Sequence, residues 1–292
     1  MYHPFKGAGV ALVTPFTEKN KIDFEALGRI IKNQVEGGMD YLVALGTTAE
    51  TPTLAADEKK EVVRFVKQNA AGLPVVVGMG GNDTRTILEQ MEKFDFDGIS
   101  GLLIVTPYYN KPSQEGMFRH YSAIAKVSPV PIILYNVPSR TGVNLEYETV
   151  VRLAEASDKI IAVKEASGIL SQITRINKYS PDHFAVISGD DVLALPIVSV
   201  GGIGVISVIA NALPGKLSSL IHLALEGKYD EARELHFDLI DLFKLLFKEG
   251  NPGGVKALMQ IQGTIQNELR SPLFRISEET YNEIKEAYLK LK

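Results

Sequence analysis

The sequence contains no cysteine among its 292 residues. Without cysteine there is no disulfide, no thiolate metal ligand and no cysteine nucleophile, so any chemistry has to come from other side chains. Long apolar runs are absent too, because no segment approaches the roughly 18 apolar residues that a membrane-spanning helix needs. The first residues, 1–16, lack the cleavage pattern of a signal peptide. We therefore expect a cytoplasmic protein without a membrane partner.

An excess of basic residues is also missing. The formal net charge is -4 and the two signs are interspersed, so no basic stripe could neutralise a nucleic-acid backbone. The five histidines are scattered without a carboxylate at ligand spacing, and the glycine-rich segments 78–82 and 201–204 lack the spacing of a dinucleotide loop. We expect no nucleic-acid partner, no metal and no cofactor.

Short apolar runs rich in Val, Ile and Leu recur along the chain. Each is bounded by Gly, Pro or polar residues, as is typical of a parallel strand that is covered on both faces. The eight runs are 9–15, 40–46, 74–80, 101–107, 131–137, 160–166, 184–190 and 202–209.

Segments with helical spacing separate these runs. After the first run, Phe24, Leu27, Ile31 and Val35 form one apolar stripe. Eight strand and helix units predict an α/β fold, a closed (β/α)8 TIM barrel, over residues 1–225. Residues 226–292 have long amphipathic stretches and no strand run, which predicts additional C-terminal helices packed on the barrel. The sequence Asn-Pro-Gly-Gly at 251–254 predicts a break between two of them.

The carboxyl ends of barrel strands are where such folds gather reactive groups. Lys164 follows the apolar residues 160–163, and alternation places it on the same face as Ile160 and Ala162. An ammonium there would be desolvated, which favours the free amine that attacks a carbonyl carbon. The alternative is a rim lysine paired with a carboxylate, although Glu165 is a poor partner because successive strand residues face opposite ways. A lysine nucleophile predicts Schiff-base chemistry.

Imine formation and enamine formation both require proton transfer. Tyr135 ends the strand beside that of Lys164, and Thr47 and Tyr109 follow other strands, so their hydroxyl groups could relay protons. The alternative for each is a tyrosine packed on the rim or a threonine that caps the next helix.

Other strand ends offer groups that bind anions. The guanidinium of Arg140 suits a carboxylate, as do the hydroxyls and backbone amides of Thr47 and Thr48; a solvated loop arginine is the alternative. Asp190 and Asp191 are expected to cap the following helix rather than hold Mg²⁺.

Six motifs in order are GTTAET (46–51), TPYYNKPSQEG (106–116), YNVPSRTG (135–142), VKEASG (163–168), SGDD (188–191) and GVISV (204–208). Over essentially the whole chain they resemble the dihydrodipicolinate synthase and N-acetylneuraminate lyase family of pyruvate-dependent class I aldolases. The intact YNVPSRTG stretch favours its synthase branch, which condenses pyruvate with L-aspartate 4-semialdehyde on the diaminopimelate route to lysine.

The resemblance implies a role for each matching residue. Lys164 would form the imine, and Tyr135, Thr47 and Tyr109 would relay protons. Tyr109 would reach the active site of a neighbouring subunit. The assembly would be a homotetramer built from two dimers. Thr48 would bind the pyruvate carboxylate, Arg140 the semialdehyde carboxylate, and backbone groups of Gly189 and Ile206 would line the pocket. Tyr108 would lie at the dimer contact, and Asn82 and Tyr108 match residues of a lysine-binding regulatory site.

Two departures from the family pattern stand out. Ala49 replaces the usual fourth-position glycine of the GTTGE motif, for which we expect a small backbone adjustment and retained activity. Ala56 and Thr86 replace the histidine and glutamate of many lysine-inhibited members, so strong feedback inhibition is not expected.

Three other functions compete with this one. A sibling lyase would cleave a sugar acid such as N-acetylneuraminate or a 2-keto-3-deoxy acid with the same lysine. A non-catalytic keto-acid-binding barrel would form no trappable imine, and a phosphate-handling isomerase would not depend on Lys164.

Overall fold

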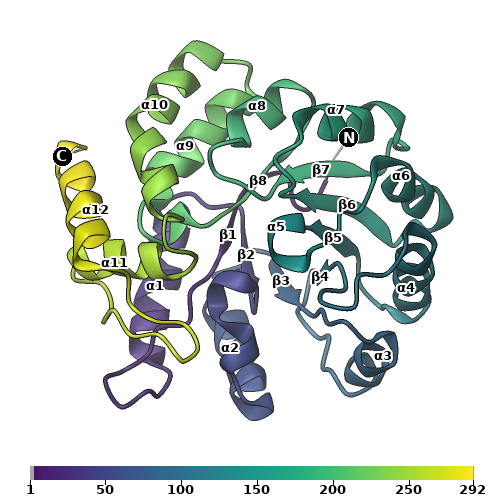
Figure 1. Ribbon diagram of the computed structural model, residues 1–292, viewed down its shortest axis with the longest axis horizontal. Helices are drawn as coiled ribbons and strands as arrows, with labels where there is room; N and C mark the ends of the chain where they lie inside the picture. Colours follow the sequence, from purple (N-terminus) through teal and green to yellow (C-terminus); the bar gives the residue numbers. More distant parts are fainter. Residues whose placement is uncertain (1–2, 292) are drawn as a thin grey trace.

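The computed structural model describes residues 3–291, in which eight parallel strands close into a barrel (Figure 1). Each strand pairs with its neighbours in chain order, and β8 pairs back onto β1, so the sheet has no free edge. Each apolar run of the sequence contributes one strand, and the predicted (β/α)8 barrel is confirmed. The strands are β1 (Gly7–Ala11), β2 (Tyr41–Ala44), β3 (Val75–Gly78), β4 (Gly101–Val105), β5 (Ile132–Asn136), β6 (Ile160–Glu165), β7 (Ala185–Ser188) and β8 (Gly204–Ser207).

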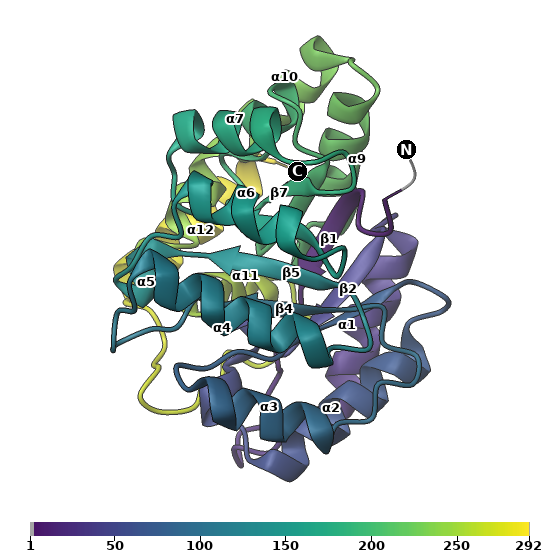
Figure 2. The same cartoon turned by 90° about the vertical axis from the view of Figure 1, so that its right-hand side faces the viewer.

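Helices connect the strands and surround the barrel, which Figures 1 and 2 show from two directions. They are α1 (Phe24–Glu36), α2 (Ala56–Asn69), α3 (Thr84–Glu92), α4 (Gln114–Val127), α5 (Pro138–Thr141), α6 (Tyr147–Ala156), α7 (Leu170–Tyr179), α8 (Ala194–Ser199) and α9 (Pro214–Leu225), with the 3₁₀ turns η1 (Thr47–Ala49), η2 (Thr51–Thr53) and η3 (Ile209–Asn211). No helix among residues 3–291 is both long and apolar enough to cross a membrane.

Two apolar clusters hold the barrel together. The inner cluster fills the barrel with residues that include Tyr41, Ile133 and Ile206, and the outer cluster joins the strands to the helices. Strand residues supply both clusters because successive side chains point to opposite faces. Each fully buried side chain of this kind stabilises the fold by roughly 1.5–3 kcal/mol.

The first helix illustrates how the sequence specifies a helical segment. The side chain of Asp23 caps α1 by accepting a hydrogen bond from a first-turn amide. In the predicted stripe Leu27 and Ile31 are buried, whereas Phe24 and Val35 at its ends are half-buried. The 3.6-residue period therefore located the packed face of this helix.

The C-terminal helices α10 (Tyr229–Leu245), α11 (Gly253–Ile261) and α12 (Glu278–Lys290) pack beside the barrel (Figure 1). The predicted break at 251–254 is only partly right, because α10 ends earlier and both glycines begin α11. A Cβ on Gly254 would lie 2.4 Å from the carbonyl oxygen of Leu246, so close helix packing explains this glycine. The division into a barrel (1–225) and an extension (226–292) stays a prediction.

Strand β6 departs from simple alternation. Its pairing with β5 shifts register, because Ile132 pairs with Ile160 whereas Ile133 pairs with Ala162. Ile160 consequently belongs to the outer cluster, while Ile161 and Ala162 both contact the inner one. The prediction that Ile160 shares a face with Lys164 is wrong, because one extra residue at this bulge resets the alternation.

Candidate active site

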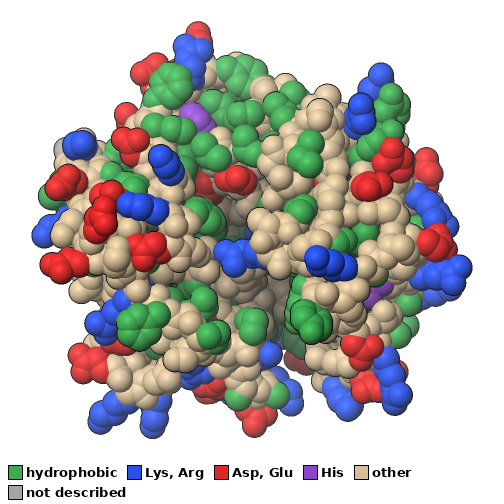
Figure 3. Space-filling model, in the orientation of Figure 1, with side chains coloured by type: hydrophobic (Ala, Val, Ile, Leu, Met, Phe, Trp, Pro, Cys, Tyr) green, Lys and Arg blue, Asp and Glu red, His purple; other side chains and the backbone are tan. Residues whose placement is uncertain are grey.

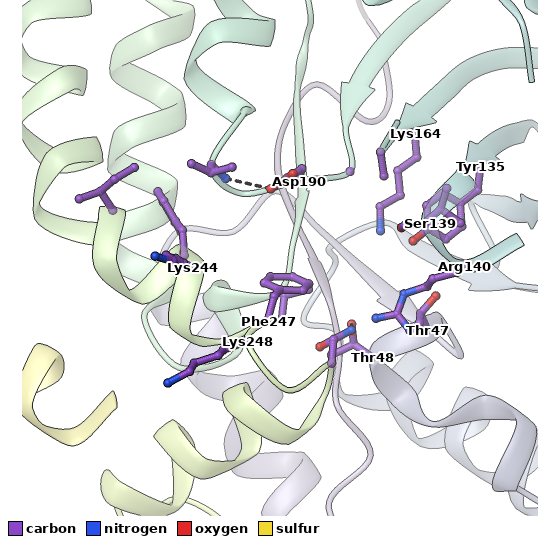
Figure 4. Close-up of a pocket in the computed structure, with 18 of the residues that line it drawn as sticks. Thr47, Thr48, Tyr135, Ser139, Arg140, Lys164, Asp190, Lys244, Phe247 and Lys248 are labelled. Carbon is purple, nitrogen blue, oxygen red and sulfur yellow. Dashed lines mark hydrogen bonds between the residues drawn. The ribbon is translucent and has the colours of Figure 1, made fainter. Parts of the chain in front are cut away.

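Lys164 lies near the end of β6, and its side chain points into the barrel mouth (Figure 4). The residue is 4% exposed, and Nζ lies 4.5 Å from the centroid of the Tyr135 ring. Tyr135 is its register partner on β5, so two neighbouring strands hold the amine against the phenol. Within residues 3–291 no carboxylate forms an ion pair with this amine. The geometry therefore does not favour a rim lysine neutralised by a salt bridge.

Gly189 leaves the space that the lysine side chain occupies. A Cβ at this position would lie 3.1 Å from Cε of Lys164 and 2.8 Å from Cβ of Ala166. Both distances are shorter than ordinary carbon contacts, so a side chain here would displace the lysine or the strand. The backbone amide of Gly189 meanwhile donates to the Glu165 carbonyl at 2.8 Å, which joins β7 to β6.

Thr47 and Thr48 lie in the turn η1, in the loop after β2, and both line the same cavity as Lys164. The side-chain amide of Asn251 donates to Thr48 Oγ1 at 3.0 Å and fixes that hydroxyl. Ala49 lies in this turn and has no positive φ, whereas Glu50 is in the left-handed region, with φ 55°. The alanine therefore introduces no left-handed strain into the loop.

A cavity of about 670 Å³ connects these groups, and Figure 3 shows the surface hollowed near the middle of this face. Arg140 reaches the cavity from the short helix α5, and in Figure 4 its side chain extends beside Thr47. Arg140 is exposed, and no acidic side chain in the part of the chain that the structure describes forms an ion pair with it. Its guanidinium is available to an anionic ligand.

The opposite wall of the cavity was not predicted from the sequence. Helix α10 supplies Ile240, Phe243 and Lys244, and the residues after it supply Phe247 and Lys248. The amphipathic pattern of this segment predicted packing on the barrel, and nothing in the pattern distinguishes a face that packs from one that borders a cavity.

The two aspartates after β7 do not cap the following helix, which corrects the prediction. Helix α8 begins with Leu193 as N-cap and has no side-chain cap. Asp191 instead accepts hydrogen bonds from the amides of Val208 and Ile209 after β8, and burial raises its pKa to about 6. Asp190 lines the cavity; burial raises its pKa, and the amide of Val192 and the charge of Lys164 act in the opposite sense.

Four of the predicted site residues lie outside the cavity wall. Tyr109 is 89% exposed and has φ 72°, and its neighbour Tyr108 is also exposed. The backbone carbonyl of Asn82 accepts a hydrogen bond from the Asn110 side chain at 2.8 Å, which joins the two loops. Ile206 is buried in the inner cluster of the barrel. The structure thus brings together Thr47, Thr48, Tyr135, Arg140, Lys164 and Gly189.

No group of three or more His, Asp and Glu side chains in residues 3–291 is arranged to hold a metal ion. The cavity itself presents the amine of Lys164, hydroxyl groups, the guanidinium of Arg140 and the carboxyl group of Asp190.

Comparison with known proteins gives the family. Residues 4–291 match the model of the Dihydrodipicolinate synthetase family. The chain belongs to this family. A 4-hydroxy-tetrahydrodipicolinate synthase of Parabacteroides distasonis is 50% identical over 287 residues, which cover 98% of this chain and 97% of that one. One from Halalkalibacterium halodurans is 42% identical, covering 94% and 93%.

Solved structures agree. Dihydrodipicolinate synthase from Thermotoga maritima superposes with a TM-score of 0.95 at 39% identity, covering 99% of both chains. The protein is accordingly a lyase of the class I aldolase type, and the synthase reaction of lysine and diaminopimelate biosynthesis is favoured over sugar-acid cleavage. The predicted fold class and enzyme class are confirmed.

Proposed function

We propose that this enzyme condenses pyruvate with L-aspartate 4-semialdehyde through an imine at Lys164. The observation that carries the proposal is the buried amine at the end of β6, 4.5 Å from the Tyr135 ring centroid and without an ion-pair partner in residues 3–291. An amine in such surroundings is available as a nucleophile toward a carbonyl carbon.

The bonds that form and break follow from this amine. Nζ attacks C2 of pyruvate, and the carbinolamine loses water to give an iminium ion. The iminium withdraws electrons from C3, which loses a proton and becomes the nucleophilic carbon of an enamine. C3 then attacks the aldehyde carbon of the second substrate and forms the new carbon-carbon bond. The amino group of that substrate attacks C2, closes the ring of 4-hydroxy-tetrahydrodipicolinate and releases Lys164.

Hydroxyl groups carry the protons in this proposal. Tyr135 adjoins the amine and exchanges protons with the carbinolamine, and Thr47 passes them on toward the cavity mouth. Tyr109 completes the relay from a neighbouring subunit, a role that its exposed position on this subunit supports.

Recognition of the two carboxylates involves different loops. Thr48 and the amides of η1 bind the pyruvate carboxylate, and the backbones of Gly189 and Ile206 line the pocket beside it. Arg140 binds the carboxylate of the semialdehyde as a two-pronged donor.

The assembly belongs to the same proposal. We place Tyr108 at a dimer contact, two dimers in a homotetramer, and the enzyme in the cytoplasm. Asn82 and Tyr108 are retained from the regulatory lysine site of related enzymes, whereas Ala56 and Thr86 stand where its histidine and glutamate would be. We expect weak feedback inhibition by lysine.

The test measures pyruvate consumption with aspartate 4-semialdehyde, with the product coupled to a dihydrodipicolinate reductase. The Lys164→Ala variant is the control, and borohydride with pyruvate should add a stable mass to the wild-type chain alone. Turnover in the wild type and none in Lys164→Ala is the expected result. If the imine is trapped but there is no turnover with aspartate 4-semialdehyde, the enzyme is instead a sibling lyase with another second substrate. If well-folded protein traps no imine, the proposed mechanism is wrong.

A further inference from the structure

The positions of Lys164 and Tyr135 relative to each other depend on the register between β5 and β6 near the cavity. The bulge at Ile161 interrupts the pairing of these strands on the far side from the cavity. Beyond the bulge Tyr135 pairs with Lys164, and both side chains face the barrel interior. If β6 shifted by one residue against β5, Lys164 would point outward and an adjacent residue of β6 would face Tyr135.

Directly after this inward pair comes an outward pair, Asn136 and Glu165. Both residues are essentially inaccessible to solvent. The side-chain amide of Asn136 donates to both carboxylate oxygens of Glu165 at 3.1 Å. The Ser167 amide at 2.7 Å and the Gln172 side chain at 3.0 Å donate to the same carboxylate. Every one of these partners is a hydrogen-bond donor.

Second hydrogen bonds fix which way the two amides point. Asn136 Oδ1 accepts from the Leu145 backbone at 2.9 Å, and Gln172 Oε1 accepts from the Asn144 side chain at 2.8 Å. Both NH₂ groups therefore point to the Glu165 side, where they donate to its carboxylate and also to Asn144 Oδ1, at 2.8 Å from Asn136 and 3.3 Å from Gln172. Burial raises the pKa of the Glu165 carboxyl, while the hydrogen bonds from Ser167, Asn136 and Gln172 lower it. With donors only around it, this group is built to be held as a carboxylate.

We infer that Asn136 and Glu165 are positioning residues, which lock the register of β5 against β6 and so hold Lys164 and Tyr135 face to face. The inference rests on the proposed imine at Lys164. Neither residue touches the substrate, because both lie on the outer face of the barrel. They act through the backbone of the residues that precede them.

The experiment replaces Glu165 by glutamine, whose NH₂ group would oppose the donors of Asn136, Gln172 and Ser167. We measure the rate of borohydride trapping with pyruvate per folded molecule, and kcat and KM for pyruvate. We expect Glu165→Gln to slow both trapping and kcat about tenfold to a hundredfold, since small displacements of reacting groups have effects of this size. The exchanged pair Asn136→Asp with Glu165→Gln should recover part of the trapping rate, because a carboxylate again faces an amide.

The matched control is Glu155→Gln on the exposed face of α6, which should trap pyruvate at the wild-type rate. If Glu165→Gln does not fold, Glu165→Asp shortens the carboxylate by one methylene and poses the same question. A folded variant with wild-type trapping and kcat would overturn the inference, as would an exchanged pair no faster than the single variant. Failure to trap the wild type would instead count against the imine itself.

Discussion

At the scale of single residues, the site depends on one glycine that makes room for the lysine. Gly189 is in van der Waals reach of Lys164, so Gly189→Ala should push the amine away from Tyr135. We expect kcat to fall about tenfold to a hundredfold while the fold persists, because the change alters position rather than chemistry.

The measurement for this prediction is kcat together with the melting temperature. Gly215→Ala is a suitable control, since a Cβ there meets nothing within 4 Å at the start of α9. Equal activity of Gly189→Ala and wild type would contradict the close contact between a side chain at position 189 and Lys164.

A second residue, His120, makes stability depend on pH. Its ring is buried, its Nδ1 lies 2.8 Å from the Thr84 hydroxyl, and burial lowers its pKa to about 4. The ordinary value is 6.5, so between pH 6.5 and 4 the unfolded chain binds the proton more strongly. The contribution is therefore intact above pH 6.5 and is lost as the pH falls. From pH 7 to pH 5 this costs about 2 kcal/mol.

Asp191 has the opposite tendency, because its raised pKa favours the folded state as the pH falls below about 6. The test therefore compares wild type with His120→Gln by urea unfolding at both pH values. The wild type should lose about 2 kcal/mol more than the variant on going to pH 5. An equal loss in both proteins would contradict the assignment of this dependence to His120.

At the scale of elements, the η1 loop is held by a helix from the end of the chain. Lys256 on α11 and Glu50 form an ion pair in which both side chains are fully buried. Burial lowers the pKa of Lys256 to about 8, and the charge of Glu50 acts in the opposite sense. Glu50 Oε2 also accepts from the Arg270 backbone at 2.9 Å. The pair thus joins α11 and the segment after it to the loop after β2.

Breaking this pair leaves a buried carboxylate without its cation. Lys256→Met should lower the free energy of unfolding by about 3–5 kcal/mol. Lys228→Met removes an exposed pair with Glu226 instead and should leave the free energy of unfolding nearly unchanged, because solvent screens that pair. Urea unfolding of the two variants decides the matter, and similar losses for both would refute the structural importance of the buried pair.

The sequence predicted local elements better than contacts between distant ones. The strand runs and the strand-end polar residues are visible because burial on both faces leaves a short apolar signal that ends at the rim. Lys164 and Tyr135 could be predicted to meet because neighbouring strands end together. The Lys256–Glu50 pair and the α10 wall could not, since their partners lie far apart in the chain and periodicity reports only which face is apolar.

Local exceptions to periodicity were missed as well. Alternation alone places Ile160 on the inner face of the barrel, because a bulge adds one residue and leaves no signal in the sequence. The sequence position of Asp191 predicts a cap for α8, because an aspartate that caps the next helix and one that accepts hydrogen bonds from a distant strand end have the same local sequence.

At the scale of the whole molecule, the role proposed for the exposed Tyr109 would make activity depend on assembly. If Tyr109 serves the site of a neighbouring subunit, variants Tyr109→Phe and Lys164→Ala should complement each other when mixed and reassociated. Random mixing should give about a quarter of the wild-type activity, since half of the dimers are mixed and each has one intact site.

The measurement is turnover before and after dissociation and reassociation of the mixed variants, with sedimentation to follow the assembly. Each variant treated alone is the control for refolding effects. If the activity never exceeds the sum of the two separate variants, Tyr109 acts in the active site of its own subunit.

The hydrogen bonds from α11 and from the turn that precedes it also bear on how the protein is made. Thr48 receives its hydrogen bond from Asn251, and Glu50 its cation from Lys256, partners that lie 203 and 206 positions later in the chain. A ribosome has synthesised Thr47, Tyr135 and Lys164 long before these supports exist. The nascent chain therefore carries Lys164 without a completed pocket, and the pocket becomes complete only when synthesis is nearly finished.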